Sequence, residues 1–232
     1  MKKYKVHFFL FLNIFLYAHL CFANDFNSSV WSGLGGRAHG DNGTLIIGVN
    51  KSTNKLTGYY ETSNTTEDGT NECQIFFSGT IDQKNNLTDL IMSDAHKGFL
   101  GLKSEIFKGK LVLQKNGGVF RAVLYPQEKS WSCAWLYDGL PSYMPPKDFN
   151  LRDGLKFEFI RNENHIATNV VRANRAYFHS ESNDSTASKA FLVAGDLIYV
   201  YDEKPGWYYV KYQGRKKETV GWIKKSDTIQ FP

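Results

Sequence analysis

This chain of 232 residues lacks the patterns that many enzymes and metal proteins carry. It has no GxSxG motif and no HExxH motif, which argues against serine hydrolases and zinc peptidases of those types. Its three cysteines include no CxxC pair and its histidines are scattered singly, so the sequence predicts no metal site. No carboxylate pair for glycoside cleavage can be identified. We therefore expect neither catalysis nor a cofactor.

Helical periodicity is also missing beyond the first residues. Apolar and polar residues alternate instead, with turn residues every eight to twelve positions, which predicts an all-β protein. Consecutive antiparallel strands of this kind close into a small barrel or sandwich. We expect strands at residues 43–49, 56–62, 72–81, 110–114, 119–125 and 130–137. Asn116-Gly117 is a hairpin signal, and residues 89–108 fit either a short helix or an irregular loop.

Composition divides the remaining chain into two units. Three of the six prolines fall within residues 140–150, which is typical of a connector. We expect an amino-terminal β domain over 24–150, a connecting strand or linker over 151–166 and a second domain over 167–232. The strand expected at 155–160 fits two roles, since it completes the first domain or packs against the second.

The first 23 residues predict a secretory signal peptide. Lys2, Lys3 and Lys5 precede an apolar stretch over 7–20, and Cys21-Phe22-Ala23 predicts cleavage after Ala23. An uncleaved anchor is the alternative, although the stretch is short for a membrane span. Cleavage removes three lysines and no acids, so the net charge changes from +5 to +5 − 3 = +2. We therefore expect a periplasmic protein without a stable membrane span and without a nucleic-acid partner.

Cleavage also leaves an even pair of cysteines in an oxidising compartment. We predict a disulfide between Cys73 and Cys133, with two free thiols as the alternative. Closing a loop of about 60 residues stabilises a fold by about 4 kcal/mol in the chain-entropy model. Trp131 and Trp135 alternate with Cys133, so a disulfide would bring both indoles into the core of the first domain.

The last 65 or so residues carry the clearest pattern. Ala176-Tyr177-Phe178-His179-Ser180 is followed by Gly195-Asp196, by Lys204-Pro205-Gly206 and by Gly221-Trp222-Ile223. This succession of short strands and turns resembles the bacterial SH3-like (SH3b) domains. The resemblance implies a small SH3-like β-barrel that binds ligands and is not catalytic. In wall-binding SH3b domains the implied ligand is a stem or bridge peptide of peptidoglycan.

Strand alternation gives this second domain a core face and an outward face. Tyr208, Val210 and Tyr212 are expected in the core. The outward face is the expected ligand site, because aromatic floors bind extended peptides in SH3 domains. The predicted ligand-binding residues are Tyr199, Tyr201, Trp207 and Tyr209, with Lys211 as a charge partner. Trp222 is expected to pack and to close the barrel.

These observations favour an exported, non-catalytic protein whose second domain binds peptidoglycan or an envelope protein. The alternative is a periplasmic immunity or inhibitor protein that neutralises a cell-wall-degrading toxin or lysozyme. A third hypothesis is a wall hydrolase whose site is formed by acidic residues of the amino-terminal domain. The discriminating observations are binding to the wall, a gene for a wall-degrading effector beside this one, and cleavage of the wall.

Overall fold

A computed structural model describes residues 27–33, 43–67, 69–82, 86–95, 106–116, 119–126, 133, 154–214 and 217–231. Within these residues the chain forms strands and two short 3₁₀ turns, so the all-β prediction is confirmed. The predicted signal peptide, the proline-rich stretch 140–150 and the strand expected at 130–137, apart from Cys133, lie outside the described residues.

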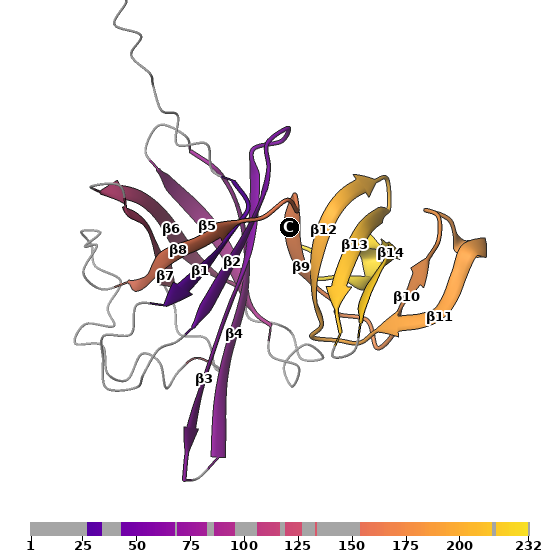
Figure 1. Cartoon of the computed structure of the whole chain (residues 1–232), viewed down its shortest axis with the longest axis horizontal. Coiled ribbons are helices and arrows are strands. Elements are labelled where there is room, and N and C mark those ends of the chain that lie inside the picture. Colours follow the sequence, from indigo (N-terminus) through magenta and orange to yellow (C-terminus); the bar gives the residue numbers. More distant parts are fainter. Residues whose placement is uncertain are drawn as a thin grey trace, which may run out of the picture.

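The first unit is a closed antiparallel barrel, as predicted. Each strand pairs with the next along the chain, and the last strand pairs with the first. The eight strands are β1 (Ser29–Gly33), β2 (Thr44–Asn50), β3 (Lys55–Thr66), β4 (Gly69–Thr80), β5 (Leu87–Asp94), β6 (Ile106–Asn116), β7 (Val119–Pro126) and β8 (Leu155–Asn162). Figure 1 shows this barrel beside a second, smaller sheet.

One strand of the barrel differs from the expectation, and another settles an alternative. Strand β5 occupies part of the segment that was expected to be helical or irregular, and it pairs with both β4 and β6. Strand β8 closes the barrel between β7 and β1, so the strand expected at residues 155–160 takes the first of its two expected roles and completes the first unit. The sequence pattern alone does not identify the partner of β8, because β1 lies more than a hundred residues earlier.

The interior of the barrel is filled by side chains. Tyr60, Phe77 and Phe157 are among the largest fully buried residues, and they pack with aliphatic side chains from the other strands. Gly58 accommodates the Phe77 ring, since a Cβ at this glycine would lie 2.1 Å from it. The predicted disulfide is present: Cys73 and Cys133 are bonded, with their Cα atoms 4.6 Å apart, inside this core.

The second unit is a six-stranded antiparallel sheet. Its strands are β9 (Ala167–Val170), β10 (Ala176–His179), β11 (Ala187–Leu192), β12 (Leu197–Lys204), β13 (Trp207–Gln213) and β14 (Glu218–Lys224). Their order is β11-β10-β14-β13-β12-β9. After β14, the 3₁₀ turn η2 (Lys225–Asp227) brings the chain back beside β9, where Thr228 forms a bridge with Val171. The second unit is thus all-β and antiparallel, as expected for the domain after the barrel.

The inner face of this sheet forms its own core. Ile198, Val200, Val210 and Ile223 are fully buried there, with Tyr208 and Tyr212 packed against them. This arrangement confirms that Tyr208, Val210 and Tyr212 point into the core. The residues that alternate with them therefore form the outward face.

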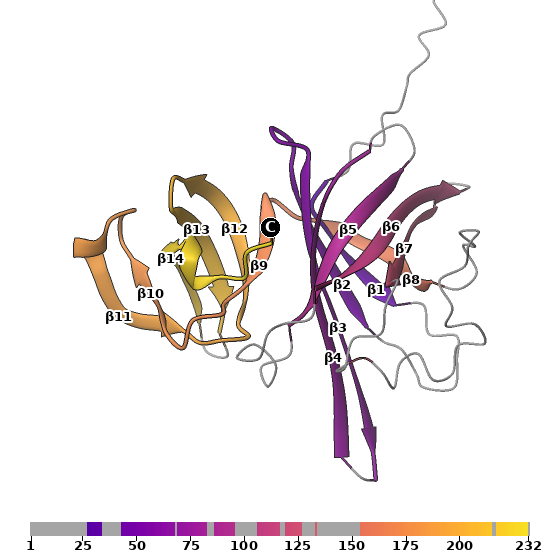
Figure 2. The same ribbon diagram turned by 180° about the vertical axis from the view of Figure 1, so that it is seen from behind.

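The two units are joined by a packed interface. Strand β9 lies against the outer face of β2 and β3 (Figures 1 and 2). Tyr59 and Phe76 of the barrel form one buried cluster with Val170 and Ile229 of the second unit. Close approach of β9 requires Gly48, because a Cβ at this position would lie 2.5 Å from the Ala167 Cα.

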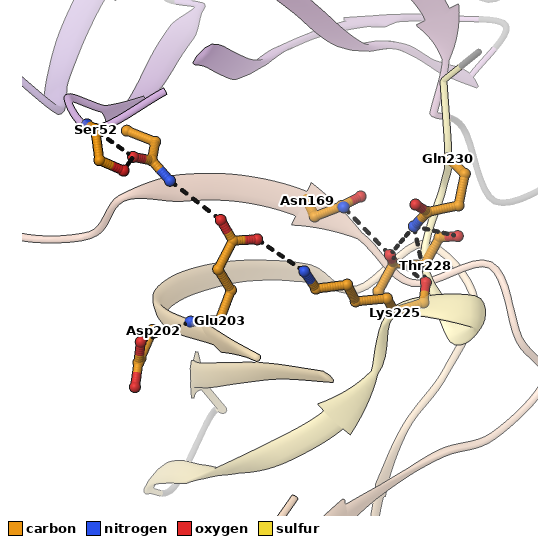
Figure 3. A network of polar contacts seen from close by, with 8 residues as sticks. Ser52, Asn169, Asp202, Glu203, Lys225, Thr228 and Gln230 are labelled. Atoms are coloured by element: carbon orange, nitrogen blue, oxygen red, sulfur yellow. Dashed lines mark hydrogen bonds and ion pairs between the residues drawn. The ribbon is translucent and has the colours of Figure 1, made fainter. Parts of the chain in front are cut away.

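Polar contacts fix the relative position of the two units. Thr168 donates its backbone N–H to the Thr57 hydroxyl over 2.8 Å, and this bond is buried. At the surface, Asn50 donates to the Glu203 carboxylate over 3.2 Å, and Lys225 donates to the same carboxylate over 2.8 Å (Figure 3). The barrel and the second sheet thus share one continuous set of buried and surface contacts.

Candidate peptide-binding face

The outward face of the second sheet carries a strip of aromatic side chains. We define the aromatic strip as His179 of β10, Trp207 and Tyr209 of β13, and Trp222 of β14. Two cross-strand pairs set its register, since Trp222 lies opposite both Tyr209 and His179. Cross-strand neighbours on one face are close enough for their rings to touch.

The rings of the strip contact one another in pairs. The Tyr209 and Trp222 rings are 5.3 Å apart, and the His179 and Trp207 rings meet edge to face at 4.8 Å. The His179 ring is further fixed by a 2.8 Å hydrogen bond between its Nδ1 and the Asn183 carbonyl. Trp207 and Tyr209 are half-buried, whereas His179 and Trp222 are buried. Two partly exposed rings thus rest on two covered ones, which gives a rigid apolar surface.

Lysine ammonium groups lie over the rings of this sheet. Lys204 lies 4.6 Å from the centre of the Trp222 ring, and Lys224 lies 5.9 Å from that of Trp207. Lys224 also forms a 2.6 Å ion pair with Asp184, and this hydrogen bond raises the pKa of the ammonium group. A cation over an indole face is held electrostatically by the ring.

The five predicted ligand-binding residues fall into two groups. Trp207 and Tyr209 belong to the aromatic strip. Tyr199 lies one strand further on, opposite Thr168 of β9, and its ring contacts His165 at 5.1 Å. Tyr201 lies at the irregularity between β12 and β13, with its ring 6.4 Å from His165.

Lys211 connects these two groups. It pairs across the strands with Tyr199, and its ammonium group lies 5.5 Å from the Tyr201 ring. The same ammonium group forms a 2.8 Å ion pair with the Glu218 carboxylate. Burial is the main cause that raises the pKa of Tyr199, followed by the nearby Glu163 and Glu61 carboxylates. Burial also raises the pKa of Tyr201, so both tyrosines are neutral phenols at physiological pH.

His165 is the most enclosed titratable group near this face. It lies between β8 and β9, and it is 2% exposed. Neither ring nitrogen makes a hydrogen bond of normal geometry with any residue that the structure describes. Burial lowers its pKa to about 4, although Glu163 and the Ile47 backbone both favour protonation. The ring is therefore neutral at pH 7.

Three residues of this face were not among the predicted site residues. His179 and Trp222 complete the strip, and Lys204 covers it. The outward position of Trp222 was predictable from strand alternation. Its neighbour Ile223 is fully buried in the core, so the indole must point to the opposite face of the sheet. No local pattern marks His179, whose contact with Trp207 joins strands that are not adjacent in the sheet.

Comparison with known proteins adds no relative: no family model, curated protein or solved structure matches this chain. Among the described residues, no helix has the length and apolar character needed to cross a membrane. The same residues contain no group of three or more histidine, cysteine or acidic side chains arranged to hold a metal ion.

Proposed function

We propose that this chain is an exported, non-catalytic binding protein. Its SH3-like second unit binds an extended peptide, of peptidoglycan or of an envelope protein, along the aromatic strip. The observation that supports this proposal is the pairing of aromatic rings on the outward face, Tyr209 with Trp222 and Trp207 with His179. Peptides in extended conformations bind aromatic-lined surfaces of this kind because rigid rings lose little entropy on contact.

The two half-buried rings of the strip are separate from the core that holds the unit together. Trp207 and Tyr209 are not part of the buried cluster around Val210 and Ile223. Replacing both aromatic side chains with alanine should therefore leave the unit folded. Aromatic residues at the centre of an interface contribute about 2 kcal/mol or more, so binding should weaken by about 30-fold or more.

The test is co-sedimentation with purified peptidoglycan sacculi, using the chain without the predicted signal peptide. The unmodified chain should pellet with the sacculi, and the Trp207→Ala, Tyr209→Ala double variant should stay in the supernatant. Phe120→Ala is the matched control, since Phe120 is an exposed aromatic residue on the barrel strand β7. Retained binding by the double variant would refute the assignment of the strip.

A second function, inhibition of a wall-degrading toxin or lysozyme, is favoured by the β3–β4 hairpin. The pairing of β3 with β2 stops at Glu61, and that of β4 with β5 stops at Ile75. Beyond these positions β3 and β4 pair with each other up to Thr66 and Gly69, and the ribbon projects from the barrel (Figures 1 and 2). Residues 62–72, TSNTTEDGTNE, contain acids and no basic residue, which suits a cationic cleft.

Inhibition assays separate this function from wall binding. Replacing residues 64–71 with a two-residue Asn-Gly turn joins the paired residues Ser63 and Glu72, shortens the ribbon and leaves Cys73 in place. If the hairpin inhibits a cationic wall hydrolase, the shortened variant should lose inhibition and keep its binding to sacculi. Equal inhibition by both proteins would exclude the hairpin as the inhibitory element.

A further inference from the structure

Four lysines of the second unit place their ammonium groups over aromatic rings. Lys204 lies over Trp222, Lys211 over Tyr201, Lys224 over Trp207 and Lys225 over Tyr208. A cation in such a position is held near the ring face by electrostatic attraction. A ligand that binds beside these rings therefore lies close to the positive charge.

Three of these four lysines already have a carboxylate partner. Lys211 pairs with Glu218 at 2.8 Å, Lys224 with Asp184 at 2.6 Å and Lys225 with Glu203 at 2.8 Å. Among the described residues, no acidic side chain forms an ion pair with Lys204. Two of these lysines, Lys204 and Lys224, lie over the aromatic strip, and of these two only Lys204 lacks a carboxylate partner among the residues that the structure describes.

The local backbone holds Lys204 in this place. It ends β12 and lies opposite Trp207, across a tight turn in which Gly206 has a φ of +78°. Two positions earlier, Asp202 shares the outward face, opposite Tyr209. The Asp202 carboxylate accepts the Glu203 N–H over 2.8 Å, so it turns back to its own strand instead of reaching the ammonium group.

We infer that Lys204, held over the Trp222 ring, recognises a free carboxylate on the bound peptide. This inference rests on the proposed function, because it concerns the same strip. The carboxylate of a peptide would lie beside the Lys204 ammonium group while the adjoining chain rests on the exposed faces of Trp207 and Tyr209. A hydrogen bond between charged groups contributes more than a neutral one, which makes the carboxylate a determinant of specificity.

The experiment uses a synthetic stem tripeptide, L-Ala-γ-D-Glu-L-Lys, as the free acid and with both carboxyl groups amidated. Binding to the chain without the predicted signal peptide is measured by isothermal titration. The free acid should bind about tenfold more tightly than the amide. Lys204→Met, which keeps the aliphatic stem over Trp222, should bind both forms equally, and Lys204→Arg should restore the preference.

Lys224→Met is the matched control, because the Lys224 charge is already neutralised by Asp184. This variant should keep the preference for the free acid. Equal binding of acid and amide by the unmodified chain, no binding of either, or an undiminished preference in Lys204→Met would overturn the inference. Sacculus binding that depends on Trp207 and Tyr209 but shows no carboxylate preference would leave the proposed function standing and remove this inference alone. Failure of both assays would remove both.

Discussion

Acidification should weaken the fold through one buried side chain, His165. The imidazole is enclosed between the barrel and the second sheet, in contact with the Tyr199 and Tyr201 rings. The chain on either side of it is fixed, since Ser28 donates to the His165 carbonyl and Ile166 donates to the Val200 carbonyl over 2.7 Å. A protonated ring at this site would be a buried charge, and its loss of hydration outweighs the favourable Glu163 carboxylate and Ile47 backbone.

The sign and the size of the effect follow from the pKa. In the unfolded chain the histidine pKa is 6.5, and in the folded chain burial lowers it to about 4. Between these values the unfolded chain binds a proton that the folded chain does not, so the free energy of unfolding falls as the pH decreases. The loss begins near pH 6.5 and is complete below about pH 4. At about 1.4 kcal/mol for each pKa unit, it amounts to about 3 kcal/mol.

The assay is urea unfolding at a series of pH values from 7.5 to 4, about the range of the two pKa values. His165→Phe removes the titrating group and keeps a planar ring, so its stability should not show this loss. Burial raises the pKa of Glu61 and of Asp227, and these carboxyls act in the opposite direction. Both remain in the variant, so the difference between the two proteins isolates His165.

Val170→Ala is the control for a change in stability alone. Val170 is fully buried in the interface between the units and does not titrate. Truncating it should lower the free energy of unfolding by about 2 kcal/mol at every pH, because the cost is lost packing. If His165→Phe shows the same pH dependence as the unmodified chain, the reasoning about His165 is refuted.

Two further predictions concern the interface and the disulfide. Gly48→Val should separate the second unit from the barrel, because the added side chain would overlap the Ala167 backbone. Limited proteolysis should then cut between the units while each retains its β circular dichroism, and an unchanged digestion pattern would contradict this. Replacing Cys73 and Cys133 together with alanine should lower the free energy of unfolding by about 4 kcal/mol, measured by urea denaturation, and an unchanged midpoint would contradict the predicted role of the bond.

The strands of the barrel were predictable where alternation was regular. Residues 44–50 and 119–126 are strands close to the expected ranges. Strand β5 was not, because its sequence LTDLIMSD places three apolar residues together and obscures the period of two. In the structure Leu90 and Met92 point into the core, and Ile91 between them is only half-buried.

The sequence allowed us to predict which residues lie on each face of the second sheet. It did not allow us to predict which parts of the barrel pack against that sheet. Alternation alone places Tyr199 and Trp207 outward from the core of their own unit. It does not reveal that β9 and β12 lie at the edge that packs on the barrel, where Tyr199 meets His165. A glycine inside a strand indicates a close approach, yet only the fold shows that β9 is what approaches Gly48.

The most direct test of the proposed function is saturation binding of the unmodified chain to purified sacculi. Increasing amounts of protein are sedimented with a fixed amount of sacculi, with and without an excess of soluble stem peptide. The proposed function predicts saturable pelleting that the peptide reverses, since both ligands occupy the strip formed by Trp207, Tyr209 and Trp222. A protein that stays in the supernatant at every concentration would contradict wall binding.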